Sequence, residues 1–160
     1  MVLLAGTFVA GGVLNTDLTY LQKAFDERIW GSLHIIRTLG ARLSGEASIT
    51  FVSGVLADRP GPGMAILAAA SSAVESLVRG LSLELAPRRV NTVSPGTTDS
   101  PLLAKTLGAG KDAFLNTVTD KLPLKRVATP DQVAYAILFL VTNEIMTGET
   151  IHVDGGQRLI

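Results

Sequence analysis

The sequence has no cysteine, only two histidines, and no excess of charge of either sign. Without cysteine the chain has neither a disulfide framework nor a thiolate nucleophile. The two histidines are far apart in the chain, which argues against a metal site. Lys plus Arg and Asp plus Glu both number 14, without any block of like charge, so nothing indicates a nucleic-acid or membrane-surface partner.

The sequence also lacks long apolar runs and a recognisable leader. No uninterrupted apolar stretch approaches the about 18 residues of a membrane span. The opening MVLLAG has no basic segment before its apolar residues and reaches Gly6 too soon for a signal peptide. These features predict a soluble cytoplasmic chain.

What is present suits one α/β domain. The 160 residues are 47% hydrophobic and 18% charged, as expected for a parallel sheet covered by helices on both faces. Four short runs bounded by turn residues are typical of strands. They are Val2–Ala5, Ser48–Ser53, Arg89–Ser94 and Thr150–Val153.

Helices are predicted between these strands. From Asp17 to Leu43, apolar residues recur every three or four positions and form one stripe, namely Leu18, Leu21, Phe25, Ile29, Leu33, Ile36 and Leu39. A second helix is predicted over Ala65–Ala86. A third, Pro130–Asn143, begins with a capping box that includes Thr129. Between Pro101 and Arg126 the pattern indicates only helical patches.

The stretch from Ile49 to Gly96 contains the most specific sequence motifs of the chain. It reads ITFVSG, then the turn-rich ADRPGPG, then a long Ala- and Leu-rich run, then RRVNTVSPG, and so makes a βαβ unit. This text resembles the core of the short-chain dehydrogenase/reductase family, as do the opening LLAG, the helix FDERIWGSLHIIRTL and the ending TGETIHVDGG. The resemblance runs from Val2 to Gly156. It implies a doubly wound, Rossmann-like fold and an oxidoreductase that interconverts carbonyls and alcohols with NAD or NADP.

The resemblance also implies that the reacting groups are substituted. It aligns the family's catalytic Ser with Gly54, its Tyr with Leu67 and its Lys with Ser71. Positions four apart share a helix face, which in the family lets the ammonium lower the phenol pKa and hold the nicotinamide ribose. Leu67 has no ionisable group and Ser71 no charge. Arg28 stands where the family has an Asn that helps to hold a water of the proton relay, or it is a solvated helix residue. We expect these four positions to be non-functional.

Hydride transfer would therefore need another acid, for which the sequence offers Ser53, Asp58 and Tyr135. His34 is interpreted as a structural side chain rather than a catalytic base. The alternative is a degenerate protein, a pseudoenzyme, that keeps the fold and oligomerises or binds a ligand without hydride transfer.

The resemblance places cofactor contacts at two strand ends. Gly6 ends the first strand, where it either lets the backbone approach a cofactor closely or is an ordinary strand-ending glycine. The text PGTTDS at 95–100 resembles the family's Pro-Gly-x-x-x-Thr segment, which meets the nicotinamide carboxamide through backbone groups. Ser100 keeps the hydroxyl of the family's Thr. The implied cofactor-binding residues are Ala5, Gly6, Pro95, Gly96, Thr97, Thr98 and Ser100.

The phosphate-binding part of such a domain is not encoded in this sequence. A doubly wound domain opens with a βαβ unit whose first turn is a Gly-rich phosphate loop, and no glycines here have the G-x-x-x-G-x-G spacing between a strand and a helix. From the size of such units, we expect roughly 60 to 80 residues of the family's domain to be missing upstream. Residues 1–160 therefore resemble the C-terminal two thirds of a family member, and NAD or NADP binding is in question. Without the upstream strands, Val2–Ala5 would be an unpaired sheet edge. The chain would then be an excerpt of a longer protein, gain partner strands by oligomerising, or aggregate.

In the family, the helices corresponding to Asp17–Leu43 and Ala65–Ala86 pack as a four-helix bundle across a two-fold axis. The resemblance thus implies a homodimer or homotetramer, with a small carbonyl compound as the possible substrate. The second helix has small residues that permit close approach, namely Ala68, Ala69, Ala70, Ser71, Ser72 and Ala73.

Overall fold

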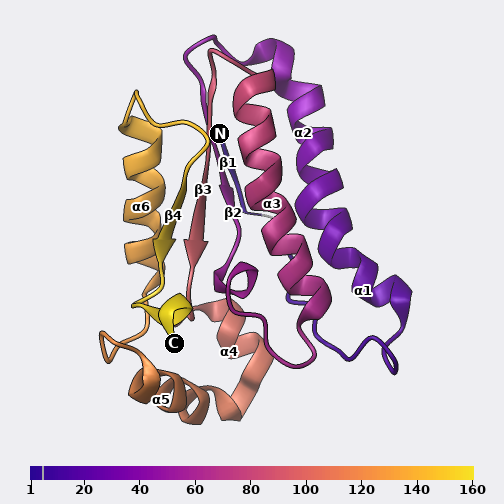
Figure 1. Ribbon diagram of the computed structural model, residues 1–160, viewed down its shortest axis with the longest axis vertical. Coiled ribbons are helices and arrows are strands. Elements are labelled where there is room, and N and C mark those ends of the chain that lie inside the picture. The colour runs from indigo at the N-terminus through magenta and orange to yellow at the C-terminus, as the bar shows by residue number, and fades with distance from the viewer. Residues whose placement is uncertain (5) are drawn as a thin grey trace.

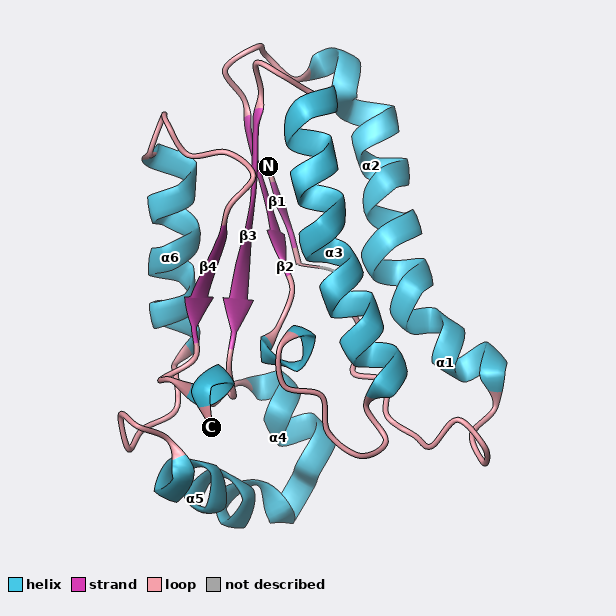
Figure 2. Cartoon of the chain, viewed as in Figure 1, coloured by secondary structure: helices cyan, strands magenta, loops and turns pink. Residues whose placement is uncertain are grey.

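The computed structural model describes residues 1–4 and 6–160, and a four-stranded parallel sheet lies at its centre (Figures 1 and 2). The strands lie side by side in chain order: β1 (Val2–Leu3), β2 (Ser48–Val52), β3 (Arg89–Pro95) and β4 (Thr150–Val153). The predicted fold class and all four strand positions are confirmed.

The strand ends differ from the prediction by small amounts. Strand β1 stops at Leu3, where we expected it to continue to Ala5, and Ala5 itself lies outside the described residues. Strand β3 extends to Pro95, which pairs with Val153 of β4. That last pairing brings the start of the predicted Pro-Gly segment into the sheet.

Helices cover both faces of the sheet and lie beneath the carboxyl ends of its strands (Figure 1). One face carries α1 (Leu18–Phe25), α2 (Ser32–Leu39) and α3 (Ala65–Glu84), and the other carries α6 (Pro130–Thr142). Beneath the strand ends lie α4 (Pro101–Leu107) and α5 (Lys111–Lys121). Single 3₁₀ turns occur at Gly40–Arg42, Val55–Ala57, Gly108–Gly110 and Gln157–Leu159.

The largest core lies between the sheet and helices α2 and α3. Its buried residues are Leu3, Ile36, Ile49, Phe51, Val74, Val78, Leu81 and Val90. By length and composition alone, α3 could cross a membrane, with a mean hydropathy of 1.3, although the sequence has no unbroken apolar run of that length. Because its apolar stripe is buried against the sheet, we interpret α3 as the core helix of a globular domain.

The first predicted helix is confirmed as a helical path, but it is not one regular helix. The segment Asp26–Gly31 between α1 and α2 is π-helical, and such wide turns often occur at functional sites. The apolar stripe nevertheless continues across it, because Leu21 and Ile36 are buried and Ile29 and Leu33 pack against the core. The placement of Leu18 in this stripe is wrong, because Leu18 begins α1 and is 67% exposed.

Helix α6 begins as its sequence indicates. The Thr129 hydroxyl accepts from the backbone N–H of Gln132, and the Gln132 side chain accepts from the N–H of Thr129. Pro130 occupies the first turn, and Leu140 is fully buried. The capping box is therefore confirmed, and it sets α6 against β2, β3 and β4.

Candidate cofactor and substrate site

Four chain segments meet at the carboxyl ends of the strands, which is where ligands bind in open parallel sheets. They are 6–7 after β1, 53–54 after β2, 95–98 at the end of β3, and 154–156 after β4. A hollow of about 470 Å³ lies between Gly6, Thr7 and Glu27 on one side and α4 on the other. A second, of about 370 Å³, lies where β4 ends and includes Ala128 and Asp154.

The positions of the family's Tyr and Lys are packed into the protein interior. Leu67 is 4% exposed and belongs to an apolar cluster with Val9, Leu21, Ala24 and Ala70. Ser71 is equally buried, and its hydroxyl donates to the backbone carbonyl of Leu67 at 2.9 Å. Neither residue presents an ionisable group to the strand ends.

The position of the family's catalytic Ser is sterically open. Gly54 has an extended backbone, with φ of 175°. A Cβ atom built on it would have one neighbour within 4 Å, the carbonyl oxygen of Pro95 at 3.8 Å. The backbone therefore does not require glycine here, and nothing in its surroundings excludes a larger side chain.

Arg28 lies within the π-helical segment and reaches the end of β1. Its guanidinium donates to the backbone carbonyl of Thr7 at 3.1 Å, and a Cβ atom on Gly6 would lie 2.7 Å from its Cζ. Burial lowers the pKa of Arg28, while the charge of Glu27 acts in the opposite direction. The solvated alternative is therefore wrong: Arg28 is a half-buried cation seated on Gly6, where the resemblance implied a cofactor.

Glu27, which sequence reasoning missed, fixes the loop after β1. Its carboxylate accepts from both the backbone N–H and the hydroxyl of Thr7. The backbone hydrogen bond lowers the pKa of Glu27, although burial acts to raise it. Glu27 and Arg28 thus bind opposite ends of the same residue, and the family's Asn position gave the only signal for them.

The Pro95–Ser100 segment has the turn expected of it, but Ser100, which the resemblance implied as a cofactor contact, caps a helix. Its hydroxyl accepts from the N–H of Leu103 at 3.3 Å and caps α4. Gly96 has no room for a side chain, because a Cβ atom would lie 2.7 Å from the Cα of Asp154. Glycine is required at this position by close backbone approach.

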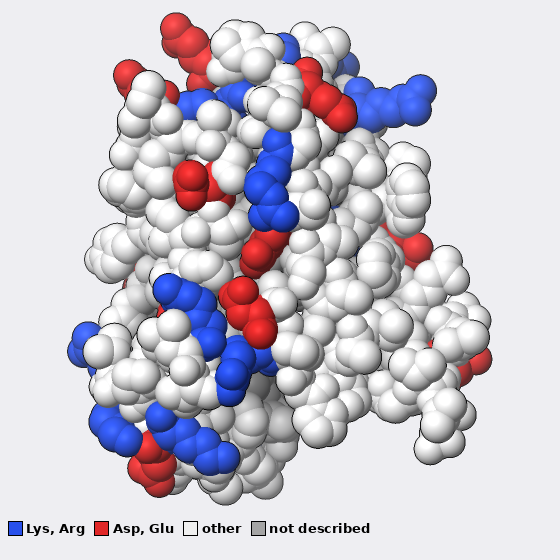
Figure 3. Space-filling model, in the orientation of Figure 1, with Lys and Arg blue, Asp and Glu red and all other residues white. Residues whose placement is uncertain are grey.

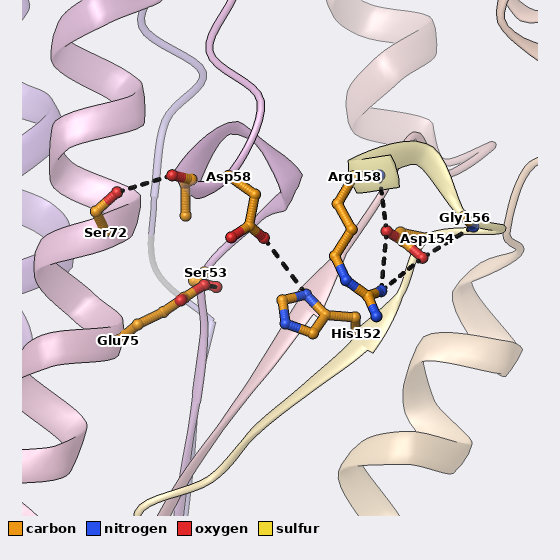
Figure 4. A network of polar contacts seen from close by, with 9 residues as sticks. Ser53, Asp58, Ser72, Glu75, His152, Asp154, Gly156 and Arg158 are labelled. Atoms are coloured by element: carbon orange, nitrogen blue, oxygen red, sulfur yellow. Dashed lines mark hydrogen bonds and ion pairs between the residues drawn. The ribbon is translucent and has the colours of Figure 1, made fainter. Parts of the chain in front are cut away.

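The three alternative acids end up in different environments. The Ser53 hydroxyl donates to Glu75 at 2.7 Å, and Asp58 lies 3.6 Å from Nδ1 of His152 (Figure 4). Tyr135 is 70% exposed on α6 and lines neither hollow, so it is not positioned as an acid for this site. His34, on α2, is exposed.

Sequence reasoning missed Glu75 and His152, the partners of these candidates. Glu75 lies one helical turn beyond Ser71, so the i, i+4 spacing that links positions 67 and 71 also reaches it. His152 aligns with Ser94 in the β3–β4 register, and the Ser94 hydroxyl is buried without a hydrogen-bond partner among the described residues. The register of the sheet, which the sequence does not encode locally, brings these groups together.

Comparison with known proteins identifies the family. Residues 1–158 match the family described as enoyl-(acyl carrier protein) reductase. Carbonyl reductase family member 4 of Danio rerio is 32% identical over 167 residues, covering 97% of this chain and 67% of that protein. The chain belongs to the short-chain dehydrogenase/reductase family. Short-chain dehydrogenase/reductase ATR9 of Stachybotrys chlorohalonatus is 33% identical over 167 residues, 99% of this chain and 63% of ATR9.

Solved structures of short-chain dehydrogenases/reductases have the same fold. A small-chain dehydrogenase in complex with NADPH matches 99% of this chain and 74% of its own, with a TM-score of 0.93 and 34% identity. The MalC reductase/Diels-Alderase from Malbranchea aurantiaca matches 99% of this chain and 62% of its own, with a TM-score of 0.91 and 29% identity. Among the curated relatives, the chain spans 44% of malC, 63% of ATR9 and 48% of the Comamonas testosteroni dehydrogenase TsaC1/TsaC2.

The nicotinamide cofactor of a short-chain dehydrogenase/reductase fits one side of this site better than the other. At the end of β3, the backbone N–H and C=O of Thr98 have no hydrogen-bond partner in the described part of the chain, so a donor and an acceptor stand side by side. At the end of β1, the space against Gly6 is taken by the Arg28 guanidinium. The residues present therefore fit the carboxamide end of such a cofactor.

Proposed function

We propose that the chain forms the nicotinamide- and substrate-facing part of an NAD(P)(H)-binding short-chain dehydrogenase/reductase whose proton relay has been lost. A bound nicotinamide would supply or accept the hydride of a carbonyl–alcohol interconversion. The chain's own residues must then hold the ligand and provide a proton at the carbonyl oxygen.

One observation carries the loss of the relay: Leu67 and Ser71 are both 4% exposed and both already have internal partners. Leu67 fills an apolar cluster, and the Ser71 hydroxyl donates to the carbonyl of its own helix. No proton donor stands at position 67, and no cation stands at position 71 to hold a ribose. Of the other acids, the Ser53 hydroxyl already donates a hydrogen bond to Glu75.

Two observations support binding of the cofactor. A structural relative with 34% identity is described as a complex with NADPH. In this chain, Gly96 keeps the close approach between β3 and β4, and Thr98 leaves both backbone groups for an amide.

The direct test is to measure cofactor binding and turnover separately in the same protein. NADPH is titrated against the chain by fluorescence, and its absorbance is then followed with a panel of ketones and aldehydes. We expect no turnover above a heat-denatured control, because loss of one general acid costs about 10²–10⁴ in rate and here the other relay groups are substituted as well.

A matched variant separates the causes. Gly54→Ser, Leu67→Tyr and Ser71→Lys together restore the family's groups, yet we expect the 160-residue chain to remain inactive because the phosphate-binding turn is not encoded in it. Turnover by the unmodified chain would refute the loss of the relay and direct attention to Ser53 and Asp58. NADPH binding without turnover supports the proposal, whereas absence of NADPH binding contradicts its cofactor-binding part.

Assembly is a second candidate function, and the outer side of α3 favours it. Of the small residues noted in the sequence, Ala68, Ala70 and Ser71 are buried inside the chain and are unsuited to an interface. The outward stripe is Ala65, Ala69, Ser72, Ser76 and Gly80. In Figure 3, the half of the surface over α1, α2 and the lower part of α3 has few charged side chains, most of them at its rim. Trp30, in the segment Asp26–Gly31, is 58% exposed, and Ile35, on α2, is 39% exposed.

We therefore propose an isologous dimer or tetramer through 17–43 and 65–86. Sedimentation of the chain at micromolar concentration should give a dimer or larger species. Ala69→Glu places a charge in the centre of the small-residue stripe and should produce a monomer. Tyr135→Glu, on the opposite helix layer, is the matched control and should leave the assembly unchanged. A monomeric unmodified chain would contradict the proposal.

A further inference from the structure

The C-terminal turn after β4 is seated directly on the Pro95–Thr98 segment. The side-chain oxygen of Gln157 accepts from the backbone N–H of Thr97 at 2.8 Å, a contact between residues 60 positions apart. A Cβ atom on Gly96 would lie 2.7 Å from the Cα of Asp154 and 2.9 Å from Oε1 of Gln157. The close packing at Gly96 and the hydrogen bond at Thr97 therefore come from the same turn.

Asp154 holds this turn in shape. It is 7% exposed, and its carboxylate accepts from the backbone N–H groups of Gly156 and Arg158, both at 3.0 Å, and from the Arg158 guanidinium at 3.3 Å (Figure 4). Burial acts to raise the pKa of Asp154, but these hydrogen bonds outweigh it and lower the pKa. The backbone N–H of Gln157 donates to the Asp154 carbonyl at 3.0 Å, and this hydrogen bond fixes the backbone from which the Gln157 side chain extends.

The chain entering α6 holds the other side of the same segment. The backbone carbonyl of Thr97 accepts from the N–H of Ala128 at 3.2 Å, and the N–H of Asp99 donates to the carbonyl of Ala128 at 2.9 Å. Thr98 lies between these two contacts, and within the described residues its own N–H and C=O are not hydrogen-bonded. The direction of the Thr98 backbone groups is thus set by its neighbours.

We propose that Gln157 is a positioning residue for the cofactor: by accepting the Thr97 N–H, it fixes the Gly96–Thr97 peptide group and thereby the direction in which the backbone at Thr98 presents its N–H and C=O to a carboxamide. The inference rests on the proposed nicotinamide binding. Without the Gln157 acceptor, the half-buried Thr97 N–H has to find another partner, and an unmade hydrogen bond of this kind favours rearrangement of the backbone. Of the relay positions, Gly54 lies beside this segment, where an added Cβ atom would be 3.8 Å from the Pro95 carbonyl oxygen.

The first test compares two substitutions of similar size and needs no cofactor. Gln157→Met removes the acceptor and keeps the length of the side chain, whereas Gln157→Glu keeps an acceptor oxygen. Amide hydrogen exchange at Thr97 should become about five- to tenfold faster in Gln157→Met, the loss of one ordinary hydrogen bond, and should be unchanged in Gln157→Glu. Leu159→Ala, an exposed residue of the same turn, is the control and should also leave this exchange unchanged.

The second test measures NADPH affinity of the same three variants by fluorescence titration. Gln157→Met should raise the Kd for NADPH about three- to tenfold, and Gln157→Glu and Leu159→Ala should stay within about twofold. Replacing the probe by the 3-acetylpyridine analogue, which lacks the carboxamide NH₂, should reduce the difference between Gln157→Met and the unmodified chain. That reduction is a readout that a general loss of stability would not produce.

The outcomes separate the two proposals. Unchanged Thr97 exchange in Gln157→Met overturns the positioning role, as does faster exchange with an unchanged Kd for NADPH. If the unmodified chain binds no NADPH, the proposed function fails, and Thr97 exchange alone then decides whether Gln157 positions the segment. Faster exchange together with weaker NADPH binding, both rescued in Gln157→Glu, establishes the role.

Discussion

Two regions at the carboxyl ends of the strands contrast sharply. On the β3–β4 side, the Pro95–Thr98 segment matches the family's motif and is hydrogen-bonded to the C-terminal turn and to Ala128. On the side formed by the end of β2 and by α3, the catalytic positions of the family are Gly54, Leu67 and Ser71. Under the proposed loss of the relay, one side keeps its backbone frame while the other has no reactive side chain at these positions.

The difference follows from what each position does for the fold. Gly96 is confined by the backbone of Asp154, so any side chain there would disturb the junction of two strands. Gly54 has open space around it, and Leu67 has joined an apolar cluster. Reactive residues that stabilise nothing can be replaced at no cost to folding, whereas residues at a close backbone approach cannot.

The largest effect that would sharpen this contrast is at Leu67. If position 67 has become a core position, Leu67→Ala should destabilise the chain by about 2–5 kcal/mol, the cost of truncating a buried leucine. Leu83→Ala, on the same helix but 81% exposed, should change stability by no more than about 0.5 kcal/mol. Urea unfolding of both variants gives the comparison, and equal midpoints would contradict a core role for Leu67.

A pair of glycine substitutions gives the next largest effect. Gly96→Ala should cost about 1–3 kcal/mol, as for overpacking against atoms that cannot move freely. Gly54→Ala should be neutral within about 0.5 kcal/mol, because its backbone is extended and its surroundings are open. Thermal and urea unfolding measure both. A tolerated Gly96→Ala, or a damaging Gly54→Ala, would break the comparison between the two sides.

The smallest predicted effect is the pH dependence at Asp154. Because its pKa is lowered in the folded state, its carboxylate contributes stability above the ordinary Asp pKa of about 3.9. That contribution is lost as the pH falls through the folded-state pKa. Asp154→Asn keeps one acceptor oxygen, so it should cost about 1 kcal/mol at pH 7.

The check is urea unfolding of the two proteins at a series of pH values. The difference in stability between them should be constant from pH 7 down to about 5 and should shrink at lower pH. A difference that is independent of pH would show that Asp154 acts through shape rather than charge.

Periodicity, turn residues and caps were sufficient to predict the four strands and the helices that cover them. Local patterns specify such elements because their buried faces repeat at fixed intervals. The π-helical segment Asp26–Gly31 could not be predicted in this way, since no local pattern signals a change of period. Leu18 was misplaced for another reason: it begins α1 and is exposed, although its spacing matches the buried stripe.

The candidate site was predictable only where a motif defined it. The resemblance located the Pro95–Ser100 segment and the substituted positions 54, 67 and 71. It did not reveal that Arg28 lies on Gly6, that Glu75 accepts from Ser53, or that Gln157 accepts from Thr97. Each of these contacts joins residues distant in sequence, and only the packing of the whole chain decides them.

The order of the strands, β1-β2-β3-β4, has a consequence for how the sheet can be built. Strands β2, β3 and β4 each pair with the strand synthesised just before them, so they can be added one after another while the chain leaves the ribosome. A chain shortened from its C-terminal end loses β4 first and then β3, and what is left is still an uninterrupted sheet. The Gln157 contact with Thr97 forms only after the last strand is in place, so the Pro95–Thr98 segment is the final part of the site to be completed.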